Sequence, residues 1–232
     1  MRIAFAYKGT FNIDYIKKYG IDNNIINQVE DTINNNFKYI FNVFKKLNYS
    51  YDIFISTYKI DNKIDGKWIE RTLPKNFYCG EPDYSSPTHI PQLNHFKRLS
   101  EMILLEEKKS NEKYDLLIFT RLDIKMLKYY DELNIDYSSF NSIFKNDSGN
   151  CDDNFFIIPR KYFDSFIESV DSLYIKNDIT HRFNHELESR GVSVHYMENF
   201  NMDIYMGHKV FEFVRCGTDP NDVFSINSNF KR

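Results

Sequence analysis

Tyr114-Asp-Leu-Leu-Ile-Phe-Thr-Arg-Leu-Asp-Ile-Lys-Met126 is a short apolar run that stops at two charged residues, Arg121 and Asp123. A run of about four to eight apolar residues between polar flanks is typical of a buried strand. Because side chains alternate along a strand, Leu117, Phe119, Arg121 and Asp123 are expected on one face. We therefore predict a buried strand whose end presents a cation and a carboxylate together.

That strand end can carry chemistry. Ligands of open α/β sheets gather at the carboxyl ends of the strands. The Asp123 carboxylate can hold a hard divalent cation, and the Arg121 guanidinium can hold phosphate oxygens. An Arg–Asp pair that only closes the strand is the alternative, and this fragment alone leaves both open.

The composition is that of a soluble globular protein. The chain has 232 residues, of which 42% are hydrophobic and 27% charged, enough for one large domain or two small ones. The net charge of −3 supplies no basic surface, so we expect no nucleic-acid partner. No apolar run approaches the roughly eighteen residues of a membrane span, and the apolar start at residues 2–7 predicts a strand, not a signal peptide.

Cys79, Cys151 and Cys216 are odd in number and widely spaced, so they predict neither a disulfide framework nor a zinc site. We accordingly expect a cytoplasmic protein, with its oligomeric state left open. Aromatic residues make up 17% of the chain and can stack on sugars, but we assign most of them to the core.

The order of elements favours a parallel sheet. Residues 2–7 and 51–58 are predicted strands, while 30–47 and 92–109 show apolar residues at helical spacing. Strands that alternate with helices are typical of a parallel sheet covered by helices. The stretch 59–91 carries four prolines and is predicted to be a long irregular loop.

The second half of the chain is less regular. Gly191 is suited to the position after a helix end. No repeat or linker divides the chain, so we predict one domain over residues 1–232. The elements expected here are strands at 142–144, within 151–159 and at 192–195, and helices at about 162–170 and 178–190.

Asp152 and Asp153 lie just before the apolar run at residues 155–158. Two adjacent carboxylates beside a buried strand cost desolvation and repulsion unless a cation or hydrogen bonds compensate. One of them can act as a general base for a bound hydroxyl group. In the alternative interpretation, Asp152 caps a turn and Asp153 is solvated.

Two polar strand ends are further candidates for binding a nucleotide. Lys8, Gly9 and Thr10 follow the first strand, although they match neither the dinucleotide-binding glycine fingerprint nor the P-loop pattern. Ser56 and Thr57 end the second strand, where their hydroxyl groups can contact a ribose or a base.

Three histidines are candidates for metal binding. His181 and His185 are one helical turn apart, but they lack the H-E-x-x-H context, which favours a surface pair. His208 lies in a polar turn and is a candidate metal ligand or phosphate contact. No nucleophile elbow, kinase signature or Cys–His pattern is present, which disfavours hydrolases, kinases and proteases.

Taken in order, four segments of the chain resemble compact nucleotide-sugar glycosyltransferases of the GT-A type, as found in bacterial and viral surface-glycan pathways. The resemblance implies an α/β, single-domain GT-A-like (Rossmann-like) fold with a mixed, mainly parallel sheet flanked by helices. It also implies a nucleotide-sugar-binding half at 1–127 and an acceptor-side half at 128–232. The four segments are Arg2–Gly9, Asn36–Tyr58, Gln92–Asp123 and Asp152–Arg160.

The resemblance also assigns roles. Asp123 takes the place of the D-x-D acid, which holds Mn²⁺ or Mg²⁺ against the donor diphosphate, while Arg121 replaces the first acid. Asp152 or Asp153 would orient or deprotonate the acceptor hydroxyl. The implied activity is sugar transfer from a nucleotide-diphosphate donor to a glycan or other hydroxyl acceptor, in polysaccharide biosynthesis. The alternatives are a non-catalytic nucleotide- or glycan-binding domain and a metal-dependent phosphotransferase or phosphohydrolase.

Overall fold

The computed structural model describes residues 1–9, 23–59, 62–81, 87, 89–145, 148–198 and 210–213. Two predicted site residues, Thr10 and His208, lie outside this part of the chain. Among the residues that the structure describes, no helix combines the length and the apolar character that crossing a membrane requires.

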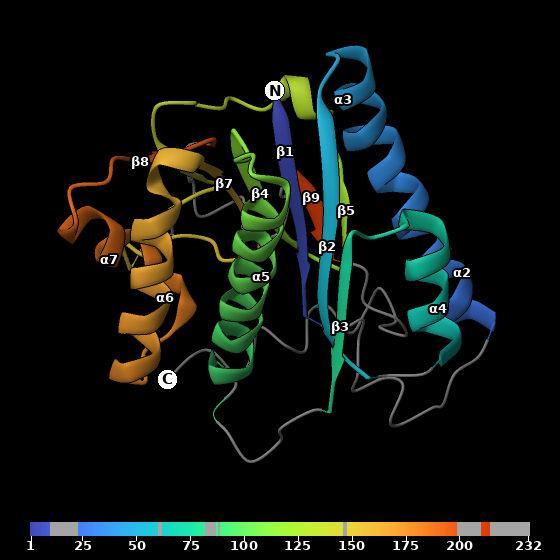
Figure 1. Ribbon diagram of the computed structural model, residues 1–232, viewed down its shortest axis with the longest axis horizontal. Coiled ribbons are helices and arrows are strands. Elements are labelled where there is room, and N and C mark those ends of the chain that lie inside the picture. Colours follow the sequence, from blue (N-terminus) through green and yellow to red (C-terminus); the bar gives the residue numbers. More distant parts are fainter. Residues whose placement is uncertain are drawn as a thin grey trace.

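Seven strands form one mixed sheet (Figure 1). They are β1 (Arg2–Lys8), β2 (Ser50–Tyr58), β3 (Asn76–Gly80), β4 (Leu116–Arg121), β6 (Phe140–Ser142), β7 (Phe155–Pro159) and β8 (Val194–Tyr196). Their spatial order is β3-β2-β1-β4-β7-β6-β8. The first four are mutually parallel, β7 is antiparallel to β4 and β6, and β8 is parallel to β6. The predicted mixed, mainly parallel sheet is confirmed, and it draws strands from both proposed halves of the chain.

Helices cover both faces of the sheet (Figure 1). One face packs against α2 (Asn23–Asn36), the π-helical turn η1 (Phe37–Phe41), α3 (Asn42–Lys46) and α4 (Asn62–Thr72). The other packs against α5 (His89–Ser110), α6 (Phe163–Lys176) and α7 (Phe183–Ser189). Short turns η2 (Tyr130–Glu132), η3 (Arg160–Tyr162) and η4 (Thr180–Arg182), and a small sheet of β5 (Ile124–Met126) and β9 (Phe211–Phe213), complete the described elements.

The two faces follow from side-chain alternation along β1. Ile3, Phe5 and Tyr7 pack toward α2 and α3, while Ala4 and Ala6 pack toward α5. Strands covered on both faces are expected to be continuous apolar runs, as β1 and β4 are. This double coverage explains why both strands were predictable from the sequence.

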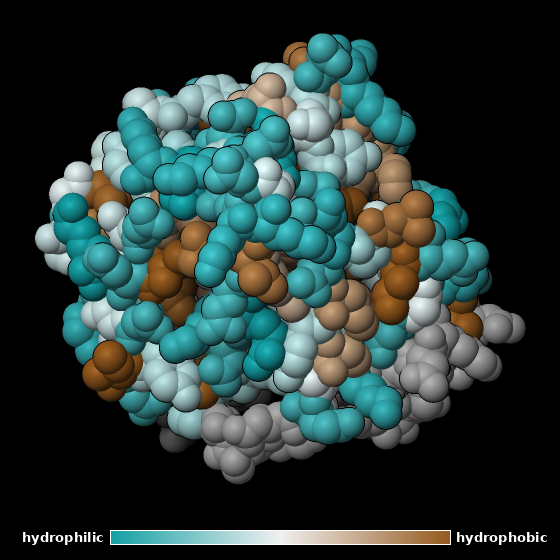
Figure 2. Space-filling view, viewed as in Figure 1, coloured by the Kyte–Doolittle hydropathy of each residue, from teal (hydrophilic) through white to brown (hydrophobic). Residues whose placement is uncertain are grey.

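Aromatic rings dominate the core. In the described part of the chain, the largest fully buried side chains are all tyrosines or phenylalanines, which confirms the assignment of most rings to the core. The face seen in Figure 2, over α5 and α6, is mainly hydrophilic, with apolar groups in separate patches.

The prediction of an irregular loop at 59–91 was wrong, because the stretch contains α4 and β3. Ile64 and Trp68, one helical turn apart, are both buried and anchor α4 to the core. The prolines were overweighted: Pro74 lies between the two elements, where it interrupts neither.

Other predicted elements are present with shifted boundaries. The helix expected at 178–190 is the turn η4 followed by α7, and it ends before Gly191, whose φ of 76° is the left-handed conformation predicted for it. The strands expected at 142–144 and 192–195 are β6 and β8.

Candidate functional site

The register of the strands brings most of the predicted site residues to one edge of the sheet, the edge formed by the carboxyl ends of the parallel strands. Lys8 at the end of β1 is paired in register with Ser56 of β2 and Arg121 of β4. Thr120 of β4 is paired with Phe155, so the residues just before β7 reach the same edge. Carboxyl ends of neighbouring parallel strands are where open α/β sheets bind ligands.

Gly9 fixes the backbone immediately after Lys8. Its φ of 87° is favoured in glycine, and its N–H donates to the Ser56 carbonyl over 3.1 Å. A Cβ at Gly9 would meet no atom within 4 Å, so it is the backbone angle, and not space, that favours glycine.

Arg121 and Asp123 form a bidentate ion pair. Arg121 Nε donates to Asp123 Oδ1 over 2.7 Å and Nη2 donates to Oδ2 over 2.6 Å. The Asp123 carboxylate is buried, with 9% of its side chain exposed. The two side chains lie together as predicted, but the guanidinium engages both oxygens of the carboxylate.

Lys8 is a buried lysine. The residue is 2% exposed, and its ammonium lies 4.5 Å from the centre of the Phe96 ring on α5. None of the described carboxylates forms an ion pair with it. Burial lowers the pKa of Lys8 to about 8, against the opposing attraction of Asp153.

The structure separates the two adjacent acids. Asp152 Oδ2 accepts the backbone N–H groups of Asn154 at 3.1 Å and Phe155 at 3.3 Å, and Oδ1 accepts the Asn154 side chain. Burial, followed by the charge of Asp153, raises the pKa of Asp152 to about 6. Asp152 therefore has the geometry of the turn cap that the sequence left as one alternative.

Asp153 faces the cations instead. Burial opposes its ionisation, but Lys8, His181, Thr180 and Arg121 together hold the pKa of Asp153 below its usual value. The Thr180 hydroxyl bonds to Asp153 Oδ2, and His181 Nδ1 lies 3.7 Å from Oδ1. Asp153 is thus a buried carboxylate whose ionised form is favoured by the cations at the ends of β1 and β4.

The two helical histidines do not act as a pair. His181 Nδ1 bonds to the Cys151 carbonyl at 3.1 Å, and His185 Nε2 bonds to the Asn150 side chain at 3.1 Å. His181 contributes to the site through Asp153, a role that spacing alone did not predict.

Ser56 and Thr57 point to opposite faces of the sheet. Ser56 is buried, and its hydroxyl lies 2.9 Å from Nδ1 of His95 on α5. Burial lowers the pKa of His95 to about 3, so its ring is neutral, and Nε2 has no hydrogen-bond partner among the described residues. The apolar spacing of the helix at 92–109 gave no signal for His95.

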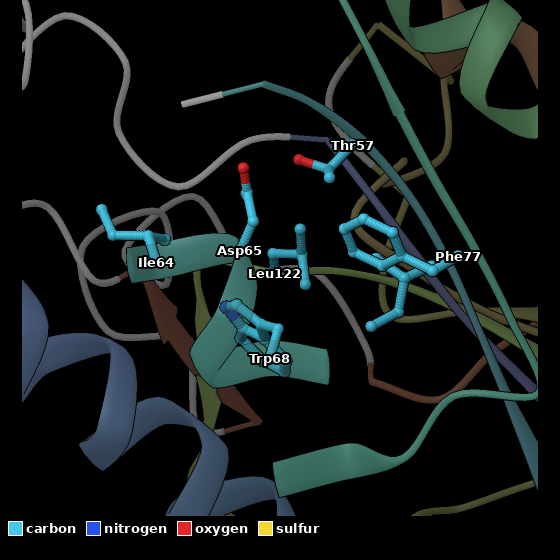
Figure 3. Close-up of a pocket in the computed structure, with 7 residues that line it drawn as sticks. Thr57, Ile64, Asp65, Trp68, Phe77 and Leu122 are labelled. Carbon is cyan, nitrogen blue, oxygen red and sulfur yellow. The ribbon is translucent and has the colours of Figure 1, made fainter. Parts of the chain in front are cut away.

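Thr57 lines a recess on the other face (Figure 3). Figure 3 shows Thr57 and Asp65 at the upper end of the recess, Leu122 below them, Phe77 to one side and Trp68 at the lower end. The space between these side chains is too narrow for a water molecule. A nucleoside base could enter only if these side chains moved, so contact with Thr57 stays a prediction.

The described residues do not fit a divalent cation. Within this part of the chain, no three His, Cys, Asp or Glu side chains form a group that could hold a metal ion. Asp123, the predicted ligand, already has both oxygens on Arg121. Because His208 lies outside the described residues, the predicted Mn²⁺ or Mg²⁺ stays a prediction.

Comparison with known proteins supports the fold. No family model and no curated protein sequence matches the chain. A crystal structure assigned as a nucleotide-diphospho-sugar transferase from Desulfovibrio desulfuricans G20 superposes with a TM-score of 0.52 at 12% identity, covering 99% of this chain and 89% of that one. A nucleoside-diphosphate-sugar pyrophosphorylase from Vibrio cholerae RC9 gives 0.52 at 13%, covering 97% and 98%. At such low sequence identities the structural similarity establishes only the fold, and this is the GT-A-like fold predicted from the sequence.

Proposed function

We propose that the chain is a glycosyltransferase that moves a sugar from a nucleotide-diphosphate donor to a hydroxyl group of a glycan or similar acceptor. One observation carries this proposal: a buried cation, Lys8, and a partly exposed one, Arg121, lie with the ionised carboxylate of Asp153 at the carboxyl edge of the parallel strands. The fold, shared with a nucleotide-diphospho-sugar transferase, supports it.

Sugar transfer suits this set of charges. The bond between the sugar C1 and the donor phosphate oxygen breaks, and its electron pair stays on the phosphate. A new bond forms between C1 and the acceptor oxygen, whose proton passes to a base. Cations near the phosphate stabilise the charge that develops there, and a carboxylate opposite activates the acceptor.

We assign the role of base to Asp153, because the Asp152 oxygens are already occupied by the Asn154 and Phe155 donors. Asp153 lies beside Thr180, whose hydroxyl is also 2.8 Å from the Gln92 side chain. These contacts fix the position of the carboxylate, and the residue is buried.

Nucleotidyl transfer is the second candidate, because the Vibrio cholerae pyrophosphorylase shares the fold equally well. In that reaction an oxygen of a sugar phosphate forms a bond to the α-phosphorus of a nucleoside triphosphate, the bond between the α- and β-phosphates breaks, and pyrophosphate leaves. The two candidates therefore differ in their products: a nucleoside diphosphate for sugar transfer, and pyrophosphate with a nucleotide sugar for the second.

The test measures the products that the protein releases from a panel of UDP-, GDP- and dTDP-sugars. Water serves as the acceptor, and each donor is assayed once with Mn²⁺ and once with EDTA. We expect one donor to release its nucleoside diphosphate. Asp153→Asn should lower this rate by about 10²- to 10⁴-fold with the fold intact. Asp171→Asn on α6, whose side chain is 47% exposed, removes the same charge and should retain the wild-type rate.

The products decide between the candidates. Formation of nucleotide sugar from a sugar phosphate and a nucleoside triphosphate, with pyrophosphate release, would favour nucleotidyl transfer. Donor binding with no product would favour a non-catalytic binding domain. A wild-type rate in Asp153→Asn would overturn the role given to Asp153.

A further inference from the structure

We propose that Lys8 supplies the positive charge that the leaving diphosphate needs, in place of a divalent cation, so that donor binding does not require a metal. This inference rests on the proposed sugar transfer and assigns the residue that receives the leaving group.

The Arg121–Asp123 pair occupies the place where a metal ligand is expected. The carboxylate accepts two short hydrogen bonds from the guanidinium, one on each oxygen. Such charge-assisted bidentate pairs are strong. A divalent cation at Asp123 would have to break them and would then lie beside the positive charge of Arg121.

Among the described residues, Lys8 is a cation without an ion-pair partner. A buried ammonium costs free energy unless it is paired, and the described residues provide only the Phe96 ring at 4.5 Å and carboxylates beyond ion-pair distance. A diphosphate oxygen at this ammonium would complete the missing pair. The lowered pKa leaves Lys8 mostly protonated at neutral pH, as this role requires.

The position of Lys8 fits the role. It ends β1, which lies between the parallel strands β2 and β4, and its register partners are Ser56 and Arg121. The charges of Asp153 and Arg121 act on it directly, so the donor phosphate and the proposed base belong to one site. When the C1–O bond breaks, the electron pair stays on the phosphate oxygen, and the Lys8 ammonium neutralises the added charge.

The experiment is calorimetric titration of the wild type with UDP and with GDP, once in EDTA and once in Mn²⁺. We expect one of these nucleotides to bind, and its affinity in EDTA should differ from its affinity in Mn²⁺ by no more than about twofold. Lys8→Met should weaken that binding by at least about tenfold in EDTA. Lys8→Gln serves as a second variant, and circular dichroism verifies that each variant is folded.

Lys97→Met is the matched control. Lys97 follows Phe96 on α5, and its side chain is 50% exposed and paired with Asp171. This variant removes the same charge outside the site, so it should bind the nucleotide as the wild type does.

Each outcome is distinct. Binding only with Mn²⁺ would overturn the inference and leave sugar transfer standing. Wild-type affinity in Lys8→Met, or equal loss in Lys97→Met, would overturn the role of Lys8. Failure of both nucleotides to bind in either buffer would instead count against the proposed function itself.

Discussion

Buried charges lie at both edges of the sheet, but they are partnered differently. At the amino edge of β4, Arg160 Nε and Nη2 each donate to a separate oxygen of Glu107 over 2.9 Å. Glu107 also accepts the backbone N–H of Tyr114 at 2.9 Å. At the carboxyl edge, Lys8 has no ion pair with any described carboxylate.

This difference in partners distinguishes a structural ion pair, Glu107–Arg160, from a candidate functional residue, Lys8. Glu107 and Arg160 satisfy each other, so their burial is explained by the fold alone. The burial cost of Lys8 is only partly offset by the charges of Asp153, Asp152 and Asp123, and strongly perturbed groups in such positions are characteristic of functional sites. The amino-edge pair therefore has a structural role, whereas the carboxyl-edge lysine is the residue to which we assign ligand binding.

The largest effect is expected at the amino edge. Glu107→Gln leaves the mostly buried Arg160 charge with only the exposed Asp164 carboxylate, at 3.3 Å, as a counter-ion. This should lower the free energy of unfolding by up to roughly 3–5 kcal/mol. Nucleotide binding at the opposite edge should not change at temperatures where the variant is folded. Urea unfolding and calorimetric titration measure the two quantities.

A double variant, Glu107→Leu with Arg160→Met, is the control for this prediction. Replacing both charges by apolar groups should recover most of the lost stability, because no uncompensated charge remains. A double variant as unstable as Glu107→Gln would show that the pair contributes more than mutual neutralisation.

The next effect is a pH dependence of stability due to Lys8. Its pKa falls from 10.5 to about 8 on folding, so the folded protein binds this proton more weakly than the unfolded chain. The cost is fully present below pH 8 and is lost as pH rises to 10.5, by about 3 kcal/mol. Lys8→Met should therefore be more stable than the wild type at pH 7, and the difference should vanish near pH 10.5.

Several neighbouring groups contribute to this titration, so only the difference between the two proteins isolates Lys8. A difference that stays constant from pH 7 to pH 10.5 would contradict the assigned pKa. The charged groups that act on Lys8 are Asp153, Arg121, Asp152 and Asp123, and the neutral ring of His95 lies close by.

The smallest effect is spectroscopic. Trp68 is the only tryptophan in the chain, is 2% exposed and lines the closed recess beside Thr57. If the base of a nucleotide opens this recess, UDP or GDP should change the Trp68 emission at the affinity found by calorimetry. Pyrophosphate has no base and should leave the emission unchanged. A saturating nucleotide without any effect would place the base elsewhere.

The central strands and the cluster at their ends could be predicted from the sequence. Strands buried on both faces leave continuous apolar runs, and polar residues at their carboxyl ends mark a ligand edge. That reasoning reached Lys8, Arg121 and the acidic pair. It could not assign different environments to Asp152 and Asp153, because their partners are set by the turn before β7 and by Thr180, 27 residues away.

The elements that could not be predicted from the sequence are those whose residue patterns give conflicting indications. α4 contains Gly66 and lies close to Pro74, and β3 is a partly buried edge strand, so neither has a clean periodic pattern. The bidentate Arg121–Asp123 geometry was also beyond the sequence, which left a metal ligand and a closing ion pair equally open. Only the distances between the two side chains separate these alternatives.

The unfolding temperature of Lys8→Met in EDTA shows whether Lys8 is a binding residue or a structural one. It is measured without ligand and with whichever of UDP and GDP binds the wild type more tightly. We expect a higher unfolding temperature than that of the wild type without ligand, and a clearly smaller increase than the wild type shows when the nucleotide is added, because the variant binds it more weakly. A lower unfolding temperature, together with the full wild-type increase on adding nucleotide, would show that Lys8 is structural.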